Sequence, residues 1–333
     1  MKKHRVVIIS LISLLLITIA FYLRLGTIII PFDRIIQTFL NRGTNIETFV
    51  LINIRLPRLI IVLFAGVALA LSGSILQSVT QNDLADPGII GINAGAGFGV
   101  TIFFLLFAHA AKDFAYLLPL AAFFGASLTA VMIFTLSRTK HVGLHPSKMI
   151  LIGIGFSMAF SGLVVLIMSA QERADVEFIA GWLSGNIWGG DWPFVYAVVP
   201  LIIVASFITY FTSQTLNVIQ LGQDTATGLG VALKKSHYSL LALATLLASL
   251  AVSVAGSIAF LGLVAPHIAK RLVGYKNQLL LPVASLIGGV LLLVADLLGR
   301  NLVQPNGMPT GIIVSLIGAP YFIYLLIKKS NLR

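Results

Sequence analysis

The stretch VIQLGQDTATGLGVALKK, residues 218–235, is a polar segment between two long apolar stretches, 192–212 and 238–260. Asp224, followed by a short run of small residues, predicts the start of a helix, and the glycines after it predict its end. The apolar stretches on either side are long enough to cross a bilayer. The segment is therefore expected to be a compact helix held at a membrane surface, either as a docking element for a separate motor protein or as an ordinary connecting loop.

Composition sets the class of the whole chain. Of 333 residues, 58% are hydrophobic and 10% are charged, and the mean hydropathy is +1.01. A soluble domain carries about 25% charged residues. The chain is therefore predicted to be an all-α polytopic membrane protein forming a single membrane domain over residues 1–333. It has no cysteine, which excludes disulfides and thiolate metal sites.

Ten apolar stretches follow one another along the chain. Pro57 is expected to start the second span, with the sequence RLPR, residues 55–58, just before it. Residues 32–40, after Pro31, form a short amphipathic segment expected along the outer membrane surface. The loop 171–191 is expected to hold an interfacial helix with its tryptophans at headgroup level. The predicted spans are 6–25, 59–77, 89–108, 114–136, 149–170, 193–212, 238–255, 256–273, 279–298 and 308–327.

Ten spans place both termini on the same side of the membrane, and charge indicates which side. Fourteen of the 22 lysines and arginines, but only three of the 11 acidic residues, fall in the segments on the side of the termini. Basic loops stay in the cytoplasm. Both termini and the polar segment around 213–236 are therefore predicted to be cytoplasmic. The net charge of +11 is explained by these loops and does not indicate a nucleic-acid partner.

The glycines of 91–99 are typical of close helix packing in lipid rather than of a nucleotide site. No strand–turn–helix context surrounds them, and no Walker-type lysine follows any glycine loop, so the chain is not expected to bind ATP. Two of the six histidines, His141 and His145, are four residues apart, but no HExxH motif accompanies them, and no catalytic constellation is present. Neither a metal site nor enzymatic activity is predicted.

Asp296 lies among apolar residues near the end of the ninth predicted span. A carboxylate there is costly unless it has a partner, and Arg300, four residues on, is expected to form an ion pair with it. Arg55 and Arg58 are predicted on the same external side. Three external arginines could bind carboxylates of a soluble partner or phosphates of lipid headgroups, and the sequence leaves both open.

Seven motifs, in order, resemble one family, the permease subunits of iron–siderophore and vitamin B12 ABC importers. They are RLPR (55–58), GVALALSGSILQ (66–77), NDLADPGIIGINAGAG (82–97), LGQDTATGLGV (221–231), GSIAFLGLVAPHIAKRLVG (256–274), LLPVASLIGGVLLLVADLLGR (280–300) and MPTGIIVSLIGAPYF (308–322). The resemblance implies ten spans, a second permease subunit, two ATP-hydrolysing subunits that bind Mg-ATP, and an extracytoplasmic substrate-binding protein. It also implies a bacterial plasma membrane.

The resemblance also implies roles for particular residues. It implies that Arg55, Arg58 and Arg300 dock the binding protein, and that the region around Ser147 forms a cytoplasmic gate. Many relatives have a glutamate and an arginine in the loop after span six, where this sequence has Gln223-Asp224 and Thr227. The residues implied to couple this loop to the ATPase are Asp224, Thr225, Ala226, Gly228, Leu229 and Gly230.

The predicted function is import of an Fe(III)–siderophore, since residues 82–97 look more like siderophore permeases than like the B12 branch. A cobalamin or haem importer with the same machinery is the first alternative. The second is an ion-coupled secondary transporter, which would need ionisable residues and broken helices at mid-membrane. Apart from Asp296 the predicted spans lack acids, which argues against that class.

Overall fold

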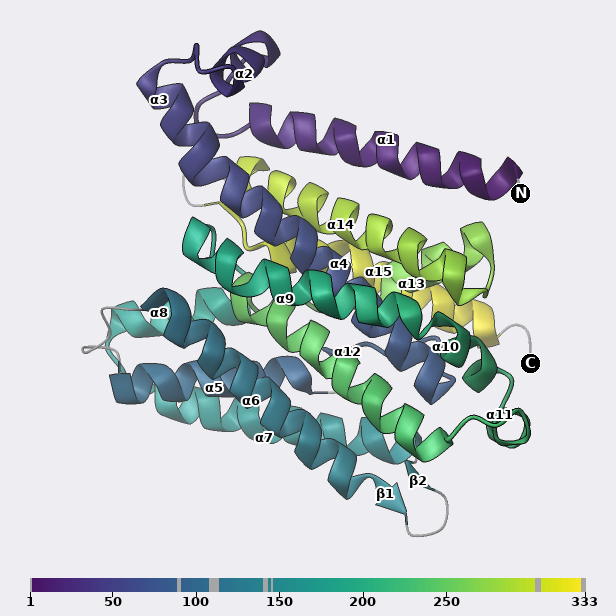
Figure 1. Ribbon diagram of the computed structural model, residues 1–333. Helices are drawn as coiled ribbons and strands as arrows, with labels where there is room; N and C mark the ends of the chain where they lie inside the picture. Colours follow the sequence, from purple (N-terminus) through teal and green to yellow (C-terminus); the bar gives the residue numbers. More distant parts are fainter. Residues whose placement is uncertain are drawn as a thin grey trace.

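A computed structural model describes residues 2–88, 91–107, 114–139, 143–144, 146–302 and 307–330 (Figure 1). These residues are helical apart from turns, connections and one small hairpin, in which the two-residue strands β1 (Arg138–Thr139) and β2 (Gly143–Leu144) pair antiparallel. The helices are α1 (Lys2–Arg24), α2 (Phe32–Phe39), α3 (Asn45–Thr48), a π-helical segment (Phe49–Arg55), α4 (Leu56–Thr80), α5 (Ile92–Phe107), α6 (Phe114–Leu136), α7 (Pro146–Met168), α8 (Arg173–Leu183), α9 (Trp192–Phe211), α10 (Ser213–Gln220), α11 (Gln223–Gly228), α12 (Leu233–Ala255), α13 (Leu261–Val273), α14 (Asn277–Leu302) and α15 (Thr310–Ser330).

Among the described residues, seven helical stretches are long and apolar enough to cross a membrane. They are His4–Arg24, Asn45–Thr80, Leu117–Leu136, Lys148–Met168, Trp192–Phe211, Leu233–Ala255 and Asn277–Leu302. Two more apolar helices, Ile92–Phe107 and Thr310–Leu325, are shorter, and α13 has 13 residues. The prediction of an all-α polytopic membrane protein is confirmed.

The bundle has two distinct ends (Figure 1). The start of α1, the short helix α11, the β1–β2 hairpin and the end of α15 lie at one end, which we call the α11 end. The opposite end carries α2, α3 and α8, and we call it the α2–α3 end. Two of the elements singled out from the sequence, the 218–235 segment and the Asp296 region, therefore lie at opposite ends.

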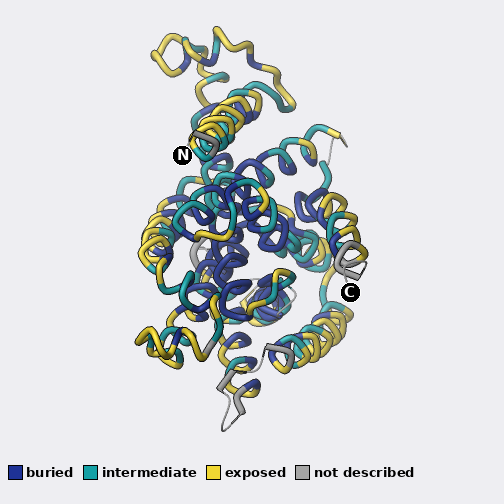
Figure 2. The backbone as a smooth tube through the Cα atoms, turned by 90° about the vertical axis from the view of Figure 1, so that its right-hand side faces the viewer, coloured by how far each residue is buried: buried dark blue, intermediate teal, exposed yellow. Residues whose placement is uncertain are grey.

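Helix α4 lies in the centre of the molecule, where α12, α13 and α14 pack against it. The most apolar stretch of the α4 span is 78% buried, whereas that of α7 is 11% buried. Figure 2 shows the same division, with buried backbone in the middle and exposed helices at the rim. The exposed sides of the peripheral helices carry large apolar residues, as expected for surfaces that face lipid.

Glycines let α4 touch its neighbours through the backbone. A Cβ built on Gly73 would lie 1.8 Å from the carbonyl oxygen of Gly262 in α13. Two turns earlier on α4, a Cβ on Gly66 would lie 2.4 Å from the carbonyl oxygen of Gly288 in α14. The small residues of this span thus allow close packing inside the bundle.

We expect Gly73→Ala to destabilise the protein by about 1–3 kcal/mol, because the added methyl group meets main-chain atoms that no rotamer change can move away. The measurement is the midpoint of thermal unfolding in detergent. Gly155→Ala in α7 is the matched control, because a Cβ there meets nothing within 4 Å. Replacing a mid-helix glycine by alanine in open space is neutral or stabilises by roughly 0.5–1 kcal/mol. Equal midpoints for the two variants would contradict the assignment of this contact.

Two expectations about local structure are wrong. The second span does not start at Pro57: the helical chain begins at Asn45, after a capping box between Thr44 and Glu47, and runs continuously to Thr80. A π-helical segment precedes Pro57, and the helix continues past this residue although proline has no N–H to donate. Residues 55–58 therefore lie inside a long helix rather than before one.

The second error concerns the loop 171–191. The expected helix is present as α8, but Trp182 is only 2% exposed, so its ring packs inside the protein and does not contact lipid headgroups. Helix α8 packs against α5. Trp188 contributes edge-on ring contacts with Phe178 and Phe194 at 5.5 and 5.1 Å. The aromatic residues of this loop fix α8 onto the bundle.

Candidate functional site

A buried carboxylate organises the α2–α3 end. Asp296 is fully buried in α14 and is held by four side chains from four helices. Arg58 in α4 binds it through two nitrogens, with Nη2 at 2.8 Å from Oδ1 and Nε at 3.2 Å from Oδ2. The predicted ion pair with Arg300 is confirmed, at 3.1 Å between Nε and Oδ2. The hydroxyl of Tyr22 donates to Oδ2 at 2.5 Å, and that of Thr310 donates to Oδ1 at 2.8 Å.

We call these five residues the Asp296 cluster. It contains two guanidinium groups and one carboxylate, so its net charge is positive. The side chains of Arg58 and Arg300 remain 21% and 22% exposed. The Cζ of Arg300 also lies 4.2 Å from the centre of the Tyr22 ring, a cation–π contact. The cluster thus leaves one positive charge uncompensated near the surface.

Arg55 differs from the other two predicted docking arginines. It is 3% exposed, and its guanidinium donates to the main-chain carbonyls of Leu23, Arg24 and Ile28. These carbonyls lie at and just beyond the end of α1, where helix carbonyls lack intrahelical donors. Arg55 is therefore buried where it ties the end of α1 to the helix that carries Arg58, whereas the side chains of Arg58 and Arg300 remain partly exposed.

Helix α11 is the element predicted from the quoted polar segment. It begins at Gln223 after Gly222, which has a φ of 105°, so Asp224 lies in its first turn and does not cap it. Ala226 is fully buried, and Leu229 is 62% exposed. The helix thus turns the small side chain of Ala226 toward the protein. The other positions predicted to couple, Asp224, Thr225, Gly228 and Gly230, are exposed.

Hydrogen bonds fix the helix that leads into α11. Gln81, at the end of α4, donates to the carbonyl of Ile219 in α10 at 2.9 Å. Gln220 donates to the Ser78 hydroxyl at 2.9 Å. At the start of α14, the side-chain amide of Asn277 donates to Asn217 Oδ1, also at 2.9 Å. Because these are specific bonds to two central helices, a displacement of α10 would be passed on to α4 and α14.

A buried lysine joins α13 to the same region. Lys270 is 7% exposed, and its ammonium donates to Gln77 Oε1 at 2.7 Å and to Asp83 Oδ1 at 2.5 Å. The same helix begins beside a break: Gly256 has a φ of 72° and Phe260 a φ of 66°. The chain therefore turns sharply at Gly256. Helix α13 is therefore a short helix tied at one end to α4 and adjoining non-helical backbone at the other.

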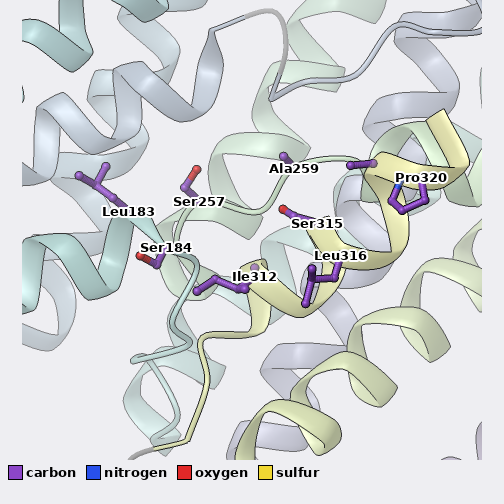
Figure 3. A pocket seen from close by; sticks show the side chains of 10 residues that line it. Leu183, Ser184, Ser257, Ala259, Ile312, Ser315, Leu316 and Pro320 are labelled. Atoms are coloured by element: carbon purple, nitrogen blue, oxygen red, sulfur yellow. The ribbon is translucent and has the colours of Figure 1, made fainter. Parts of the chain in front are cut away.

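The break at 256–260 lines a cavity of about 520 Å³ (Figure 3). Ser184 at the end of α8, Ser257 in the break and Ser315 in α15 bring hydroxyl groups to it. Among the described residues that line it, none is charged. The remaining lining residues are Leu183, Ala259, Gly311, Ile312, Leu316, Ala319 and Pro320. This cavity was not predicted from the sequence, because its residues come from three separate segments.

The predicted sites are not brought together into one. The Asp296 cluster and α11 lie at opposite ends, and Ser147 lies in the first turn of α7. Within the part of the chain that the structure describes, no group of three or more histidine, aspartate or glutamate side chains could hold a metal ion. The chain therefore offers a cavity between two polar ends rather than a reactive centre.

Closely packed membrane helices, a cavity beside a broken helix, and polar elements at both ends define an integral membrane permease. The chain belongs to the FecCD transport family, whose family model matches residues 14–328. It is a permease subunit of the ABC transporter class and is not itself an enzyme.

Individual relatives agree with this assignment. The chain is 42% identical to the iron(3+)-hydroxamate import system permease protein FhuG of Bacillus subtilis, over 99% of each chain. It is 34% identical to the hemin transport system permease protein HmuU of Yersinia pestis, over 89% of each chain. A solved chain described as an inward-facing conformation of a metal-chelate type ABC transporter superposes with a TM-score of 0.82. That chain is 29% identical, and the match covers 98% of this chain and 99% of that one.

Proposed function

We propose that this chain is the permease subunit of an importer that moves an Fe(III)–siderophore across the bacterial plasma membrane. The observation that carries the substrate class is the uncharged lining of the cavity. Three hydroxamate groups neutralise Fe(III), so a ferric trihydroxamate has no charge that the lining would need to match. Burying an unpaired charge there would be costly. The similarity to an iron-hydroxamate permease points the same way.

The proposed topology has ten spans with both termini in the cytoplasm. Helices α5, α13 and α15 complete the seven longer spans, and non-helical backbone at membrane depth is tolerated where it lines a cavity, as at 256–260. The termini lie at the α11 end, which is also the side to which the basic loops were assigned (Figure 1). In this orientation the Asp296 cluster faces outward.

Helix α11 is proposed to dock into a separate ATPase subunit, two copies of which would serve a pair of permease subunits. Its exposed face carries the side chains of Asp224, Thr225 and Leu229, and Ala226 seats it. The hydrogen bonds of α10 would transmit its displacement to α4 and α14. Ser147, at the start of α7, is proposed to lie at the cytoplasmic gate. No chemistry on the substrate is involved, and Mg-ATP would be bound by the partner chains.

An extracytoplasmic binding protein is proposed to dock on the Asp296 cluster through the uncompensated charge of Arg58 and Arg300. Carboxylates of the partner would form ion pairs with the guanidinium charge that Asp296 does not neutralise. Arg55 takes part in this docking only if its guanidinium leaves the three carbonyls of α1 that it now binds. While these bonds are in place, the contribution of Arg55 is to hold the end of α1, and with it Tyr22, beside the cluster.

We expect Arg300→Gln to weaken docking of the binding protein, with the largest loss at low salt, because it removes the charge that Asp296 leaves uncompensated. The measurement is the affinity of the binding protein for the reconstituted transporter over a series of salt concentrations. Arg173→Gln is the matched control, since it removes an arginine with a 93% exposed side chain from α8, at the same end of the bundle. An unchanged affinity for Arg300→Gln at low salt would reject this docking site.

The substrate class is tested by uptake. Vesicles containing the permease, its ATPase and its binding protein are expected to accumulate radiolabelled iron as a ferric trihydroxamate, and only with ATP inside. Haem or cobalamin uptake in place of the chelate would establish the first alternative. Accumulation without any ATPase subunit, driven by an ion gradient, would establish a secondary transporter.

A further inference from the structure

The connection between α1 and α4 exposes a row of large apolar side chains at the α2–α3 end. It stands away from the bundle in Figure 1, and its exposed backbone is visible at the top of Figure 2. Each of the following side chains is at least 40% exposed: Ile28, Ile29, Phe32, Ile36, Phe39, Leu40, Ile46 and Phe49. Eight exposed apolar side chains within one short connection indicate a contact that the isolated chain does not satisfy.

Helix α2 has one side that packs on the protein and a different side that contributes to this exposed apolar surface. Ile35 and Thr38 are buried, at 7% and 2% exposure, and so face the molecule. Phe32, Ile36 and Phe39 lie within about 60° of one another on the helical wheel, on a different side. The second apolar face is therefore turned away from the core, although the sequence alone groups Ile35 with Ile36 and Phe39.

The frame that presents α2 is fixed by polar contacts. Arg34 binds both carboxylate oxygens of Glu47, at 2.9 and 2.7 Å. Glu47 also closes the capping box with Thr44 at the start of α3, from which the helical chain continues into α4. Arg55 holds the carbonyl of Ile28 from the other side. These bonds keep the apolar face from folding back onto the protein, so another medium has to cover it.

The position of the segment indicates which medium. It joins Arg24, at the end of one helix that is long and apolar enough to cross a membrane, to Asn45, at the start of the next, so it connects two neighbouring spans on one side of the membrane. The Cζ of Arg24 lies 4.7 Å from the centre of the Phe32 ring, which puts a cation at the edge of the apolar face. Arg42 is exposed in the same segment. Apolar side chains bordered by arginines match the boundary between acyl chains and lipid phosphates.

We propose that α2 is a lipid anchor lying in the membrane interface. Phe32, Ile36 and Phe39 enter the acyl region, and Arg24 contacts phosphate groups. That this is the outer leaflet rests on the proposed topology, whereas immersion in lipid does not. Because Arg55 ties the anchor to α4, the anchor sets the height of the Asp296 cluster relative to the membrane surface.

The absence of native cysteine makes a direct test possible. Single variants Ile36→Cys, Phe39→Cys and Asp33→Cys carry a nitroxide spin label in the full chain, reconstituted in vesicles of phosphatidylcholine and phosphatidylglycerol. Collision with oxygen reports lipid exposure, and collision with a water-soluble nickel chelate reports water. We expect oxygen to dominate at 36 and 39 and the nickel chelate to dominate at 33, the matched control on the polar side of the same helix.

Two results would overturn the lipid anchor. One is equal access of the nickel chelate to 33, 36 and 39. The other is a label at 36 that loses water contact only when the binding protein or a second permease copy is added, which would make the face a protein-docking surface. A membrane-impermeant thiol reagent at Asp33→Cys reports the side of the membrane separately. Labelling from the cytoplasmic side would refute the proposed topology while leaving the lipid contact intact.

Discussion

Asp296→Asn is expected to lower the stability of the permease more than any other single polar change at the α2–α3 end. The amide cannot neutralise two adjacent guanidinium groups, and its NH2 group donates toward other donors. Removing one partner from a buried ion pair costs about 3–5 kcal/mol, because an uncompensated charge is left behind. Asp296 is fully buried and receives all of its contacts from side chains on other turns or helices. The measurement is the midpoint of thermal unfolding in detergent.

Two variants separate charge from hydrogen bonding in this result. Thr310→Val removes one neutral donor to the same carboxylate and is expected to cost about 1 kcal/mol. Arg58→Gln leaves one arginine facing one carboxylate, so its effect on the midpoint should be smaller than that of Asp296→Asn. If Asp296→Asn were no more destabilising than Thr310→Val, the cluster would not be held together by charge.

Leu229→Asp is expected to uncouple the permease from its ATPase while leaving the fold intact. The side chain is 62% exposed, so a charge there costs the isolated chain little. In a docked complex it would be desolvated, and losing such a contact at the centre of an interface costs at least ~2 kcal/mol, an affinity lower by about 30-fold. The measurements are co-purification of the ATPase subunit and stimulation of ATP hydrolysis by the loaded binding protein.

Tyr275→Ser provides a matched control for that variant. Tyr275 is 65% exposed and lies between α13 and α14, next to Asn277, which bonds to α10 at the same end of the bundle. Like Leu229→Asp, the Tyr275→Ser variant loses a large exposed apolar side chain, but outside α11. ATPase binding should therefore be unchanged in this variant if α11 is the docking element. Normal co-purification of the ATPase with Leu229→Asp would count against the coupling role, and loss of binding in both variants would place the interface elsewhere or make it broader.

The helices are held together by different kinds of contact at the two ends of the molecule. At the α2–α3 end, one buried carboxylate fixes α1, α4, α14 and α15 to one another. At the α11 end, the contacts of α10 are neutral hydrogen bonds to side chains and carbonyls. Neutral bonds of this kind contribute about 1 kcal/mol each, so they can exchange with water more readily than the buried ion pairs. Helix α10 is therefore held less firmly than the Asp296 cluster, although the ion pair of Lys270 with Asp83 also joins α13 to the α11 end.

Some features of the site could be predicted from the sequence because they are local. The ion pair of Asp296 with Arg300 follows from helical spacing, and the helix at 223–228 follows from its glycines and small residues. The burial of α4 follows from its small side chains, because small residues in a membrane helix allow neighbouring helices to approach closely. Tyr22, Arg58 and Thr310 could not be assigned to the same carboxylate, because they lie 274, 238 and 14 residues from Asp296 in sequence.

The amino-acid sequence by itself determined that this chain is a helical membrane protein and which of its segments are polar, because hydrophobicity and turn residues act over short distances. Only the tertiary structure decided that Arg55 is buried against carbonyls of α1, that Trp182 lies inside the bundle, and that hydroxyl groups from three segments share a cavity. In lipid, helices are apolar on most sides, so periodicity does not reveal which face meets which neighbour. That choice is made by shape and by the pairing of buried polar groups, which exist only once the helices have packed.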